Sequence, residues 1–152
     1  MPKLGRIPLV LLVLPALCLA GPPPVTNDDP ALERARQFTV MMDRLDKTAL
    51  MAEFCHLRGP KWVHALKTVV GNDYMEGMSA IQSSAESFAE FAPYSLKLYR
   101  WRQDSLAAFP ATMQQKDCAR FAKAPELPAA DDALRHAWRR WGGRESDFDD
   151  DH

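Results

Sequence analysis

Between residues 32 and 55, apolar residues recur at every third or fourth position, and this spacing constrains the fold more than any other feature. They are Leu32, Ala35, Phe38, Met42, Leu45, Ala49, Ala52 and Cys55. Side chains at this spacing share one face of an α-helix. Asp29-Pro30 supplies a capping carboxylate and a first-turn proline, and Gly59-Pro60 is a typical stop signal. The sequence therefore predicts one long amphipathic helix of about 28 residues.

Helical spacing continues in shorter segments along the rest of the chain. The predicted stops and bends are Gly71-Asn72, Pro93, Pro110 and a rigid linker at Pro125 and Pro128. They separate predicted helical segments over residues 61–70, 73–88, 94–109, 113–121 and 130–141. No stretch alternates apolar and polar residues for long enough to indicate a sheet, and no long segment repeats. The sequence predicts an all-α fold, an irregular bundle of five or six helices.

The N-terminus has the pattern of a secretory leader. Lys3 and Arg6 precede an apolar run over residues 7–20, and the small residue Ala20 is typical of a cleavage site. A helix over that run is about 21 Å long, whereas a bilayer core is about 30 Å thick. We therefore expect residues 1–20 to be a cleaved signal peptide. An uncleaved membrane anchor and a lipoprotein with lipid on Cys18 are the alternatives.

Removal of the leader leaves two cysteines. Because Cys18 is lost with it, Cys55 and Cys118 form an even pair in an exported chain, which predicts one disulfide. Two free buried thiols are the alternative. The predicted organisation is a signal peptide, a proline-rich linker, a helical domain and an acidic disordered tail, over residues 1–20, 21–29, 30–143 and 144–152.

Composition and charge narrow the classes of function. The chain has 152 residues, about the size of one domain, and 47% of them are apolar. Its 19 basic and 20 acidic side chains give a formal net charge of −1. This balance argues against a nucleic-acid binder held by bulk positive charge, so we expect no nucleic-acid partner.

No motif indicates catalysis, a metal or a cofactor. Glu53 and His56 form one Glu-x-x-His pair, but a di-iron bundle needs a second pair and two further glutamates. His56 and His64 lie on either side of Gly59-Pro60 without a free cysteine to complete a metal site. A nucleophile elbow, a phosphate-binding glycine loop and a haem-attachment motif are absent from the sequence. We expect no enzymatic activity; an enzyme with a site assembled from dispersed residues is the alternative.

Basic and aromatic residues alternate in two segments. Arginine and tryptophan are enriched at the energetic centres of protein interfaces. The candidate partner-binding residues are Arg100, Trp101, Arg102, Arg135, Trp138, Arg139, Arg140 and Trp141. The alternative is that the tryptophans are core residues and the arginines lie on the solvated faces of the same helices. A related hypothesis is that the acidic tail partly masks these basic-aromatic clusters.

Together these features predict a small helical binding protein, periplasmic or secreted, without catalytic activity. We expect its partner to be another protein in the cell envelope or the secreted space. A module for an anionic membrane surface or a small apolar ligand is the alternative, because the seven methionines of the chain provide adaptable apolar surface.

Overall fold

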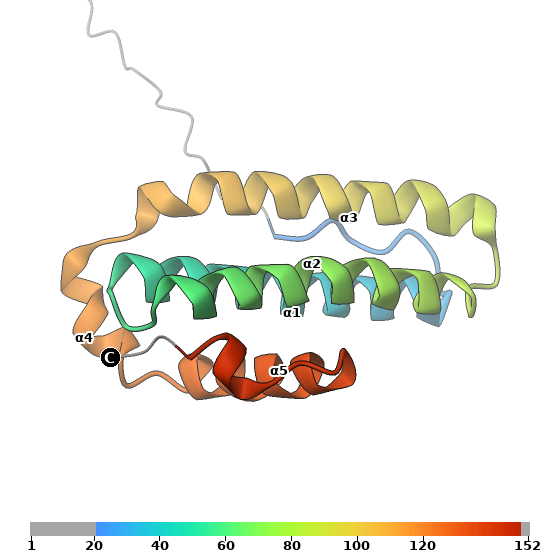
Figure 1. Ribbon diagram of the computed structural model, residues 1–152. Coiled ribbons are helices and arrows are strands. Elements are labelled where there is room, and N and C mark those ends of the chain that lie inside the picture. Colours follow the sequence, from blue (N-terminus) through green and yellow to red (C-terminus); the bar gives the residue numbers. More distant parts are fainter. Residues whose placement is uncertain (1–20, 150–152) are drawn as a thin grey trace, which may run out of the picture.

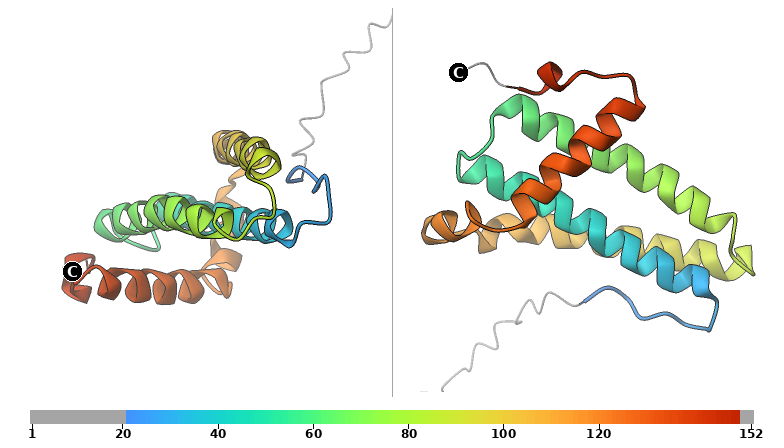
Figure 2. Two further views of the ribbon diagram at one scale, coloured as in Figure 1. Left: turned by 90° about the vertical axis from the view of Figure 1, so that its right-hand side faces the viewer. Right: turned by 90° about the horizontal axis from the view of Figure 1, so that it is seen from below.

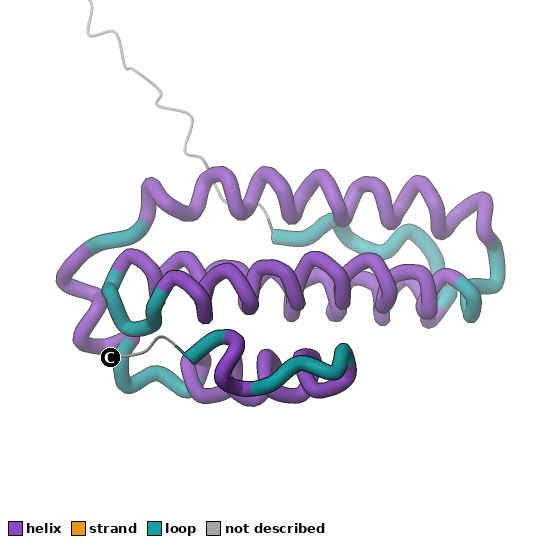
Figure 3. Tube along the Cα trace, in the orientation of Figure 1, coloured by secondary structure: helices purple, strands orange, loops and turns teal. Residues whose placement is uncertain are grey.

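The computed structural model of the chain describes residues 21–149. The predicted signal peptide and residues 150–152 lie outside the described residues. The described part contains no strand, and its five α-helices confirm the predicted all-α class. They are α1 (Pro30–Phe54), α2 (Pro60–Gln82), α3 (Phe88–Ala108), α4 (Cys118–Phe121) and α5 (Glu126–Arg140). Short 3₁₀ turns cover Phe109–Thr112, Gln115–Asp117 and Glu145–Asp147 (Figure 3).

The long helices form three layers. α1 and α2 lie side by side in the middle layer, with α3 on one side and α5 on the other (Figures 1 and 2). α1 and α2 each contact both α3 and α5. Four leucines, one from each long helix, are fully buried between the layers: Leu32, Leu66, Leu98 and Leu134. The apolar stripes of the helices thus meet in one core.

α1 begins where the sequence predicts. Pro30 is its first residue, and the carboxylate of Asp29 accepts the backbone N–H of Ala31 at 2.9 Å. The other oxygen of Asp29 accepts the N–H of Glu86 at 2.9 Å, so the same cap ties α1 to the loop between α2 and α3. α1 ends earlier than predicted, at Phe54, and Gly59 instead precedes the first residue of α2.

The predicted break at Gly71-Asn72 is wrong. α2 runs without interruption from Pro60 to Gln82 and replaces the two helices expected over residues 61–70 and 73–88. A glycine inside a helix costs only about 1 kcal/mol relative to alanine. The buried stripe of α2 continues across it from Val70 to Tyr74 and Met78, and this burial compensates for the weak position.

Three prolines also have roles other than those predicted. Pro93 lies inside α3, which starts at Phe88 rather than after the proline. Pro125 and Pro128 do not form a linker, because α5 starts at Glu126 between them. Pro128 falls in the first turn of α5, where backbone N–H groups have no partner within the helix and a proline removes no hydrogen bond.

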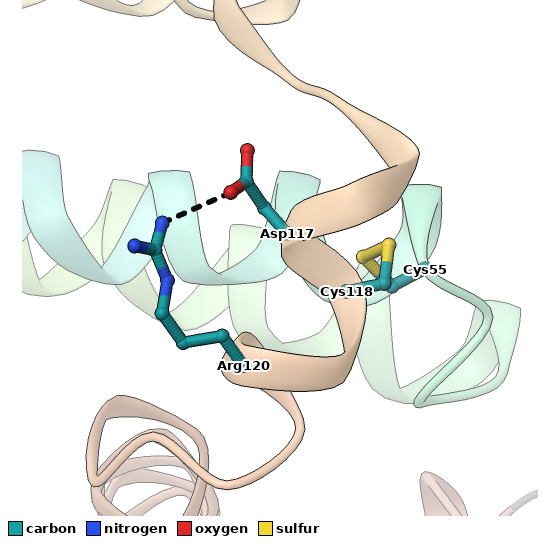
Figure 4. Close-up of a disulfide and its surroundings, with 4 residues drawn as sticks. All are labelled: Cys55, Asp117, Cys118 and Arg120. Atoms are coloured by element: carbon teal, nitrogen blue, oxygen red, sulfur yellow. Dashed lines mark hydrogen bonds and ion pairs between the residues drawn. A yellow bond between two sulfur atoms is a disulfide. The ribbon is translucent and has the colours of Figure 1, made fainter.

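The predicted disulfide between Cys55 and Cys118 is confirmed, with 5.4 Å between the Cα atoms. Cys55 directly follows α1, and Cys118 is the first residue of α4 (Figure 4). The bond therefore attaches the irregular connection between α3 and α5 to the end of α1. Among residues 21–149, every helix is too short or too polar to serve as a membrane span.

Candidate binding groove

Three adjoining cavities run along one side of α1. The first lies beside the middle of α1 and the start of α5 and has a volume of about 480 Å³. The second, about 320 Å³, shares Arg44, Thr48 and Glu126 with the first. The third, about 670 Å³, shares Met51, Phe109 and Phe121 with the second. Because neighbouring cavities share walls, we describe them as one channel, the α1 groove.

The floor of the α1 groove is apolar. Seven large apolar side chains line it, from α1, the 3₁₀ turn after α3, the loop after that turn, and α4: Val40, Met41, Leu45, Met51, Phe109, Met113 and Phe121. Met41 is 49% exposed. From Arg36 to Met51 the groove follows α1 for about 22 Å. Three of the lining side chains are methionines, which adapt their shape to a bound surface.

The rim of the groove is basic. Five basic residues and two acidic ones line it: Arg36, Arg44, Lys47, Arg120 and Lys123, with Asp117 and Glu126. Ion pairs engage Arg36 with Glu33 at 2.6 Å, Lys47 with Asp43 at 2.7 Å and Arg120 with Asp117 at 3.0 Å. Arg44 and Lys123 make no ion pair with any residue of the described part.

Local contacts fix two of these cations. Hydrogen bonds from Arg36 lower the pKa of Glu33 to about 2, so this pair is charged at neutral pH. Lys47 donates to Ser105 at 2.6 Å and lies over the ring of Phe109, 5.5 Å from its centroid. Such a cation over an aromatic face is attracted by the ring. Lys47 therefore joins the basic rim to the apolar floor.

The disulfide holds one wall of the groove. Phe121 lies three residues after Cys118 in α4, and Arg120 and Asp117 flank the same turn (Figure 4). The bond to Cys55 keeps this short helix beside the end of α1. Four residues of helix are not stable alone in water, so the position of the wall depends on this attachment.

The predicted basic-aromatic residues lie elsewhere, on two separate faces. Those of α3 and those of α5 are on opposite sides of the layer formed by α1 and α2, so they do not form one surface (Figure 2). None of the eight lines the α1 groove. Their role in partner binding stays a prediction, and their surroundings differ strongly.

On α3, Arg100 is exposed and Trp101 is half-buried. Arg102 is buried, where it forms an ion pair with Asp46 and lies 4.7 Å from the ring centroid of Tyr74. The guanidinium of Arg102 thus contacts the protein's own helices.

On α5, internal acids engage the arginines. Arg135 pairs with Asp132 at 3.4 Å, Arg139 with Glu145 at 2.6 Å and Arg140 with Asp73 at 3.0 Å. These three pairs are exposed at one or both members, where such pairs contribute little to stability. Trp141 is 39% exposed.

The start of the acidic tail contacts α5. The indole N–H of Trp138 donates to Asp147 at 3.1 Å, and the ring of Phe148 meets that of Trp138 edge-on at 6.0 Å. Phe148 is 5% exposed. The tail from residue 144 is expected to be disordered, but residues 144–149 have defined contacts. The reason is that the ring of Phe148 is buried against Trp138.

The histidines and acids singled out by the sequence do not meet in a site. Glu53 pairs with Lys67 at 3.1 Å, and both His56 and His64 are exposed. Residues 21–149 contain no group of three or more histidines, cysteines or acids placed to hold a metal ion.

Sequence reasoning missed the α1 groove. Its signal is a second stripe on α1, next to the core stripe: Arg36, Val40, Arg44 and Thr48 recur at intervals of four. The far walls come from residues more than 60 positions later in the chain, and no local pattern predicts that approach.

Comparisons of the chain with protein-family models, with curated proteins and with solved structures found no match. The α1 groove is accordingly interpreted from its own chemistry.

Proposed function

We propose that this chain is an exported, non-catalytic binding protein that holds an acidic, amphipathic helix of another protein in the α1 groove. The observation that carries the proposal is the combination of an apolar floor and a rim with five basic and two acidic residues. An amphipathic helix places apolar side chains on one face, which fits such a floor. Acids beside that face meet the basic rim.

The geometry favours an extended occupant. The groove follows α1 for about 22 Å, which matches a helix of about 15 residues. Arg44, exposed and without an internal ion pair, lies near the middle of its α1 wall. Opposite charge at a binding surface raises the association rate and the specificity. The two unpaired cations, Arg44 and Lys123, are therefore the recognition groups of this proposal.

The test uses a synthetic amphipathic helical peptide of about 15 residues with acids beside its apolar face. Its affinity is measured by calorimetry against a matched peptide in which lysines replace the acids. We expect only the acidic peptide to bind, with an affinity that falls as salt increases. Arg44→Glu is expected to weaken binding about tenfold, since it reverses a rim charge.

Arg135→Glu serves as the matched control, because it reverses a charge in the α5 cluster instead of in the groove. Unchanged affinity in this variant is expected. If Arg135→Glu weakens peptide binding and Arg44→Glu does not, the peptide binds at the basic-aromatic cluster of α5 and the groove proposal fails. Equal binding of the acidic and basic peptides also contradicts it.

The methionine content of the groove supports one competing function, binding of an anionic lipid or small apolar ligand. Met41, Met51 and Met113 line the cavities. Flotation with vesicles containing anionic lipid separates the two functions. Two results together would favour a membrane surface over a protein partner. The chain floats with the vesicles unless it carries Arg44→Glu, and the acidic peptide does not bind.

The exported location is a separate part of the proposal and has its own test. It rests on the leader pattern of residues 1–20 and on the disulfide, which persists in oxidising compartments. We expect the intact mass of protein from the producing cells to correspond to a chain beginning at Gly21. A mass that includes residues 9–20 contradicts cleavage.

A further inference from the structure

The end of the described chain folds back onto α5. After α5 the chain reverses direction, and residues 144–149 return beside the helix (Figures 1 and 2). We call these residues the tail segment. They lie against basic and aromatic residues that the sequence singles out and the proposed function does not use. Four of these residues make up what we call the α5 surface: Arg135, Trp138, Arg139 and Trp141.

Two glycines make this reversal possible. Gly142 has a φ of 76°, a backbone conformation that other residues rarely adopt. The N–H of Gly143 donates to the carbonyl of Trp138 at 3.0 Å, and a Cβ atom at Gly143 falls 2.1 Å from Nε1 of Trp138. The absence of a side chain therefore lets the backbone pass close to the indole. This glycine turn closes the end of α5 by itself, so the helix does not need the tail segment as a cap.

The tail segment contacts the α5 surface in the way that a bound peptide does. The carboxylate of Glu145 accepts from Arg139 at 2.6 Å, and the carboxylate of Asp147 accepts the indole N–H of Trp138 at 3.1 Å. The ring of Phe148 meets the ring of Trp138 edge-on, with 6.0 Å between their centroids. The α5 surface thus recognises an acid, one spacer residue, a second acid and an aromatic ring.

Few interactions hold the tail segment in place. The side chains of Arg139 and Glu145 are 69% and 50% exposed, and exposed ion pairs contribute little to stability. Phe148 is the one buried residue of the tail segment. α5 ends at Arg140, before the tail segment begins, and its helical layers do not depend on the later residues. The tail segment can therefore leave the α5 surface while the helices stay packed.

Part of the α5 surface is accessible even with the tail segment in place. Arg135 lies one turn before Arg139, is exposed and pairs only loosely with Asp132, at 3.4 Å. Trp141 is 39% exposed, and its ring centroid is 5.9 Å from that of Trp138. Arginine and tryptophan are the side chains that most often dominate binding energy at interfaces. A longer ligand therefore has contacts available that the tail segment does not make.

We infer that the α5 surface is a second binding site, which takes an acidic segment of a partner protein with an aromatic residue in it, and that the tail segment competes for this site within the chain. The seated tail segment defines the occupant: one acid for Arg139, one for the indole N–H of Trp138, and a ring against that indole. A tethered competitor has an effective concentration that is roughly millimolar. Only a partner that makes further contacts, as with Arg135 or Trp141, displaces it efficiently.

The test uses the full chain and a synthetic peptide with the sequence of residues 144–149, blocked at both ends. This length keeps the turn in which Asp147 accepts the N–H of Arg144 at 2.8 Å. Binding is followed through the indole N–H signal of Trp138 in nuclear magnetic resonance spectra, assigned from its loss in Trp138→Phe. Phe148→Ala is expected to bind the peptide at least tenfold more tightly than wild type, because apparent affinity increases with the fraction of open sites.

A second variant opens the site without removing the buried ring. Glu145→Ala/Asp147→Ala removes the two carboxylates that contact α5 and is also expected to bind the peptide more tightly than wild type, by several-fold. Circular dichroism checks that both opened variants are folded. A control peptide with alanine in place of its phenylalanine is expected not to bind, since it lacks the ring that packs on Trp138.

Charge reversals then locate the site. In the Phe148→Ala chain, Arg139→Glu is expected to weaken peptide binding at least tenfold, because it places like charges together. Arg44→Glu, the matched control in the α1 groove, is expected to leave peptide binding unchanged, since none of the residues of the α5 surface lines that groove.

Four results overturn the inference. The first is equal peptide affinity in wild type and both opened variants, and the second is no binding to opened variants that are folded. The third is binding that Arg44→Glu abolishes and Arg139→Glu leaves intact, which assigns the peptide to the α1 groove. The fourth is a wild-type dimer that Phe148→Ala dissociates, which assigns the α5 surface to the tail segment of a second copy. None of them contradicts the proposed function, whose test uses a helical peptide and depends on Arg44.

Discussion

Arg102 is a buried cation at the contact between α1 and α3. Its guanidinium pairs with Asp46 and lies over the ring of Tyr74, and its Nε atom has no partner. Asp43 is also buried and pairs with Lys47, which donates to Ser105 of α3. Burying such charges is costly unless each has its partner. This network makes the α1–α3 contact depend on a few specific residues.

A double-mutant cycle measures that dependence. Arg102→Met and Asp46→Leu are each expected to lower the free energy of unfolding by about 3–5 kcal/mol, since each leaves a buried charge unpaired. The double variant is expected to lie within about 2 kcal/mol of wild type, because both charges are then gone. Urea denaturation followed by circular dichroism gives all four values.

Arg36→Met is the control for this cycle. Arg36 and Glu33 form a half-exposed pair on the surface of α1, so the expected loss is below about 1 kcal/mol. The assigned pairing is contradicted if the double variant loses as much unfolding free energy as the two single variants together.

Asp46 gives a pH dependence of definite sign. Desolvation raises its pKa above the ordinary value of 3.8, although Arg102 opposes the shift. The folded state therefore holds the Asp46 proton more tightly than the unfolded state does. The resulting stability is fully present below pH 3.8 and is lost as the pH rises through the raised folded pKa.

The measurement is the difference in unfolding free energy between wild type and Asp46→Asn at several pH values. As the pH rises, the unfolding free energy of wild type is expected to fall relative to that of Asp46→Asn. Glu33→Gln is the comparison with the opposite sign, because hydrogen bonds from Arg36 lower the pKa of Glu33 to about 2. An Asp46 difference that favours wild type more at higher pH refutes this account.

Helices with local signals at both ends are predictable at the scale of the element. Asp29-Pro30 and a regular apolar stripe fixed the start and the inward face of α1. α2 was predicted in two pieces because Gly71 has a low helix propensity. Tertiary packing outweighs the low helix propensity of the glycine, because Val70, Tyr74 and Met78 are buried in the core. Local propensity does not contain that contribution.

The two glycines inside α2 differ in what surrounds them. A Cβ atom at Gly71 has no heavy atom within 4 Å. A Cβ atom at Gly77 falls 2.2 Å from Cζ of Phe38, whose ring stacks on Tyr74. Gly71 is therefore a weak helical position, whereas Gly77 permits close packing of α2 on α1.

Alanine substitutions test this difference as a matched pair. Gly71→Ala is expected to stabilise the protein by about 0.5–1 kcal/mol through helix propensity alone. Gly77→Ala is expected to destabilise it by about 1–3 kcal/mol, because Phe38 must move. Thermal unfolding of both variants checks the signs. Stabilisation by Gly77→Ala shows that the ring of Phe38 moves aside at no cost.

At the scale of the whole molecule, the sequence predicts the helical class and the disulfide but not the candidate site. The all-α class follows from spacing, and the disulfide follows from cysteine number once export is assumed. The α1 groove requires Phe109, Phe121 and Glu126 to reach α1 from far along the chain. That approach depends on how helices pack, and apolar spacing identifies a face without identifying its neighbour. The basic-aromatic segments were prominent locally, yet packing placed them on opposite sides of the central layer.

The disulfide links overall stability to the groove, and the double variant Cys55→Ala/Cys118→Ala separates the two effects. Cys55 and Cys118 are 63 positions apart. A closed loop of that size restricts the unfolded chain by up to about 4 kcal/mol in the chain-entropy treatment, so a loss of about 2–4 kcal/mol is expected in urea denaturation. The four leucines that join α1, α2, α3 and α5 are not affected, and helical content is expected to persist.

The acidic peptide is expected to bind the same double variant at least several-fold more weakly, because α4 carries Phe121 and Arg120 of the groove wall and loses its attachment to α1. Calorimetry on wild type and on the double variant measures the two affinities. Peptide affinity equal to wild type in the double variant shows that the wall at α4 holds its position without the bond.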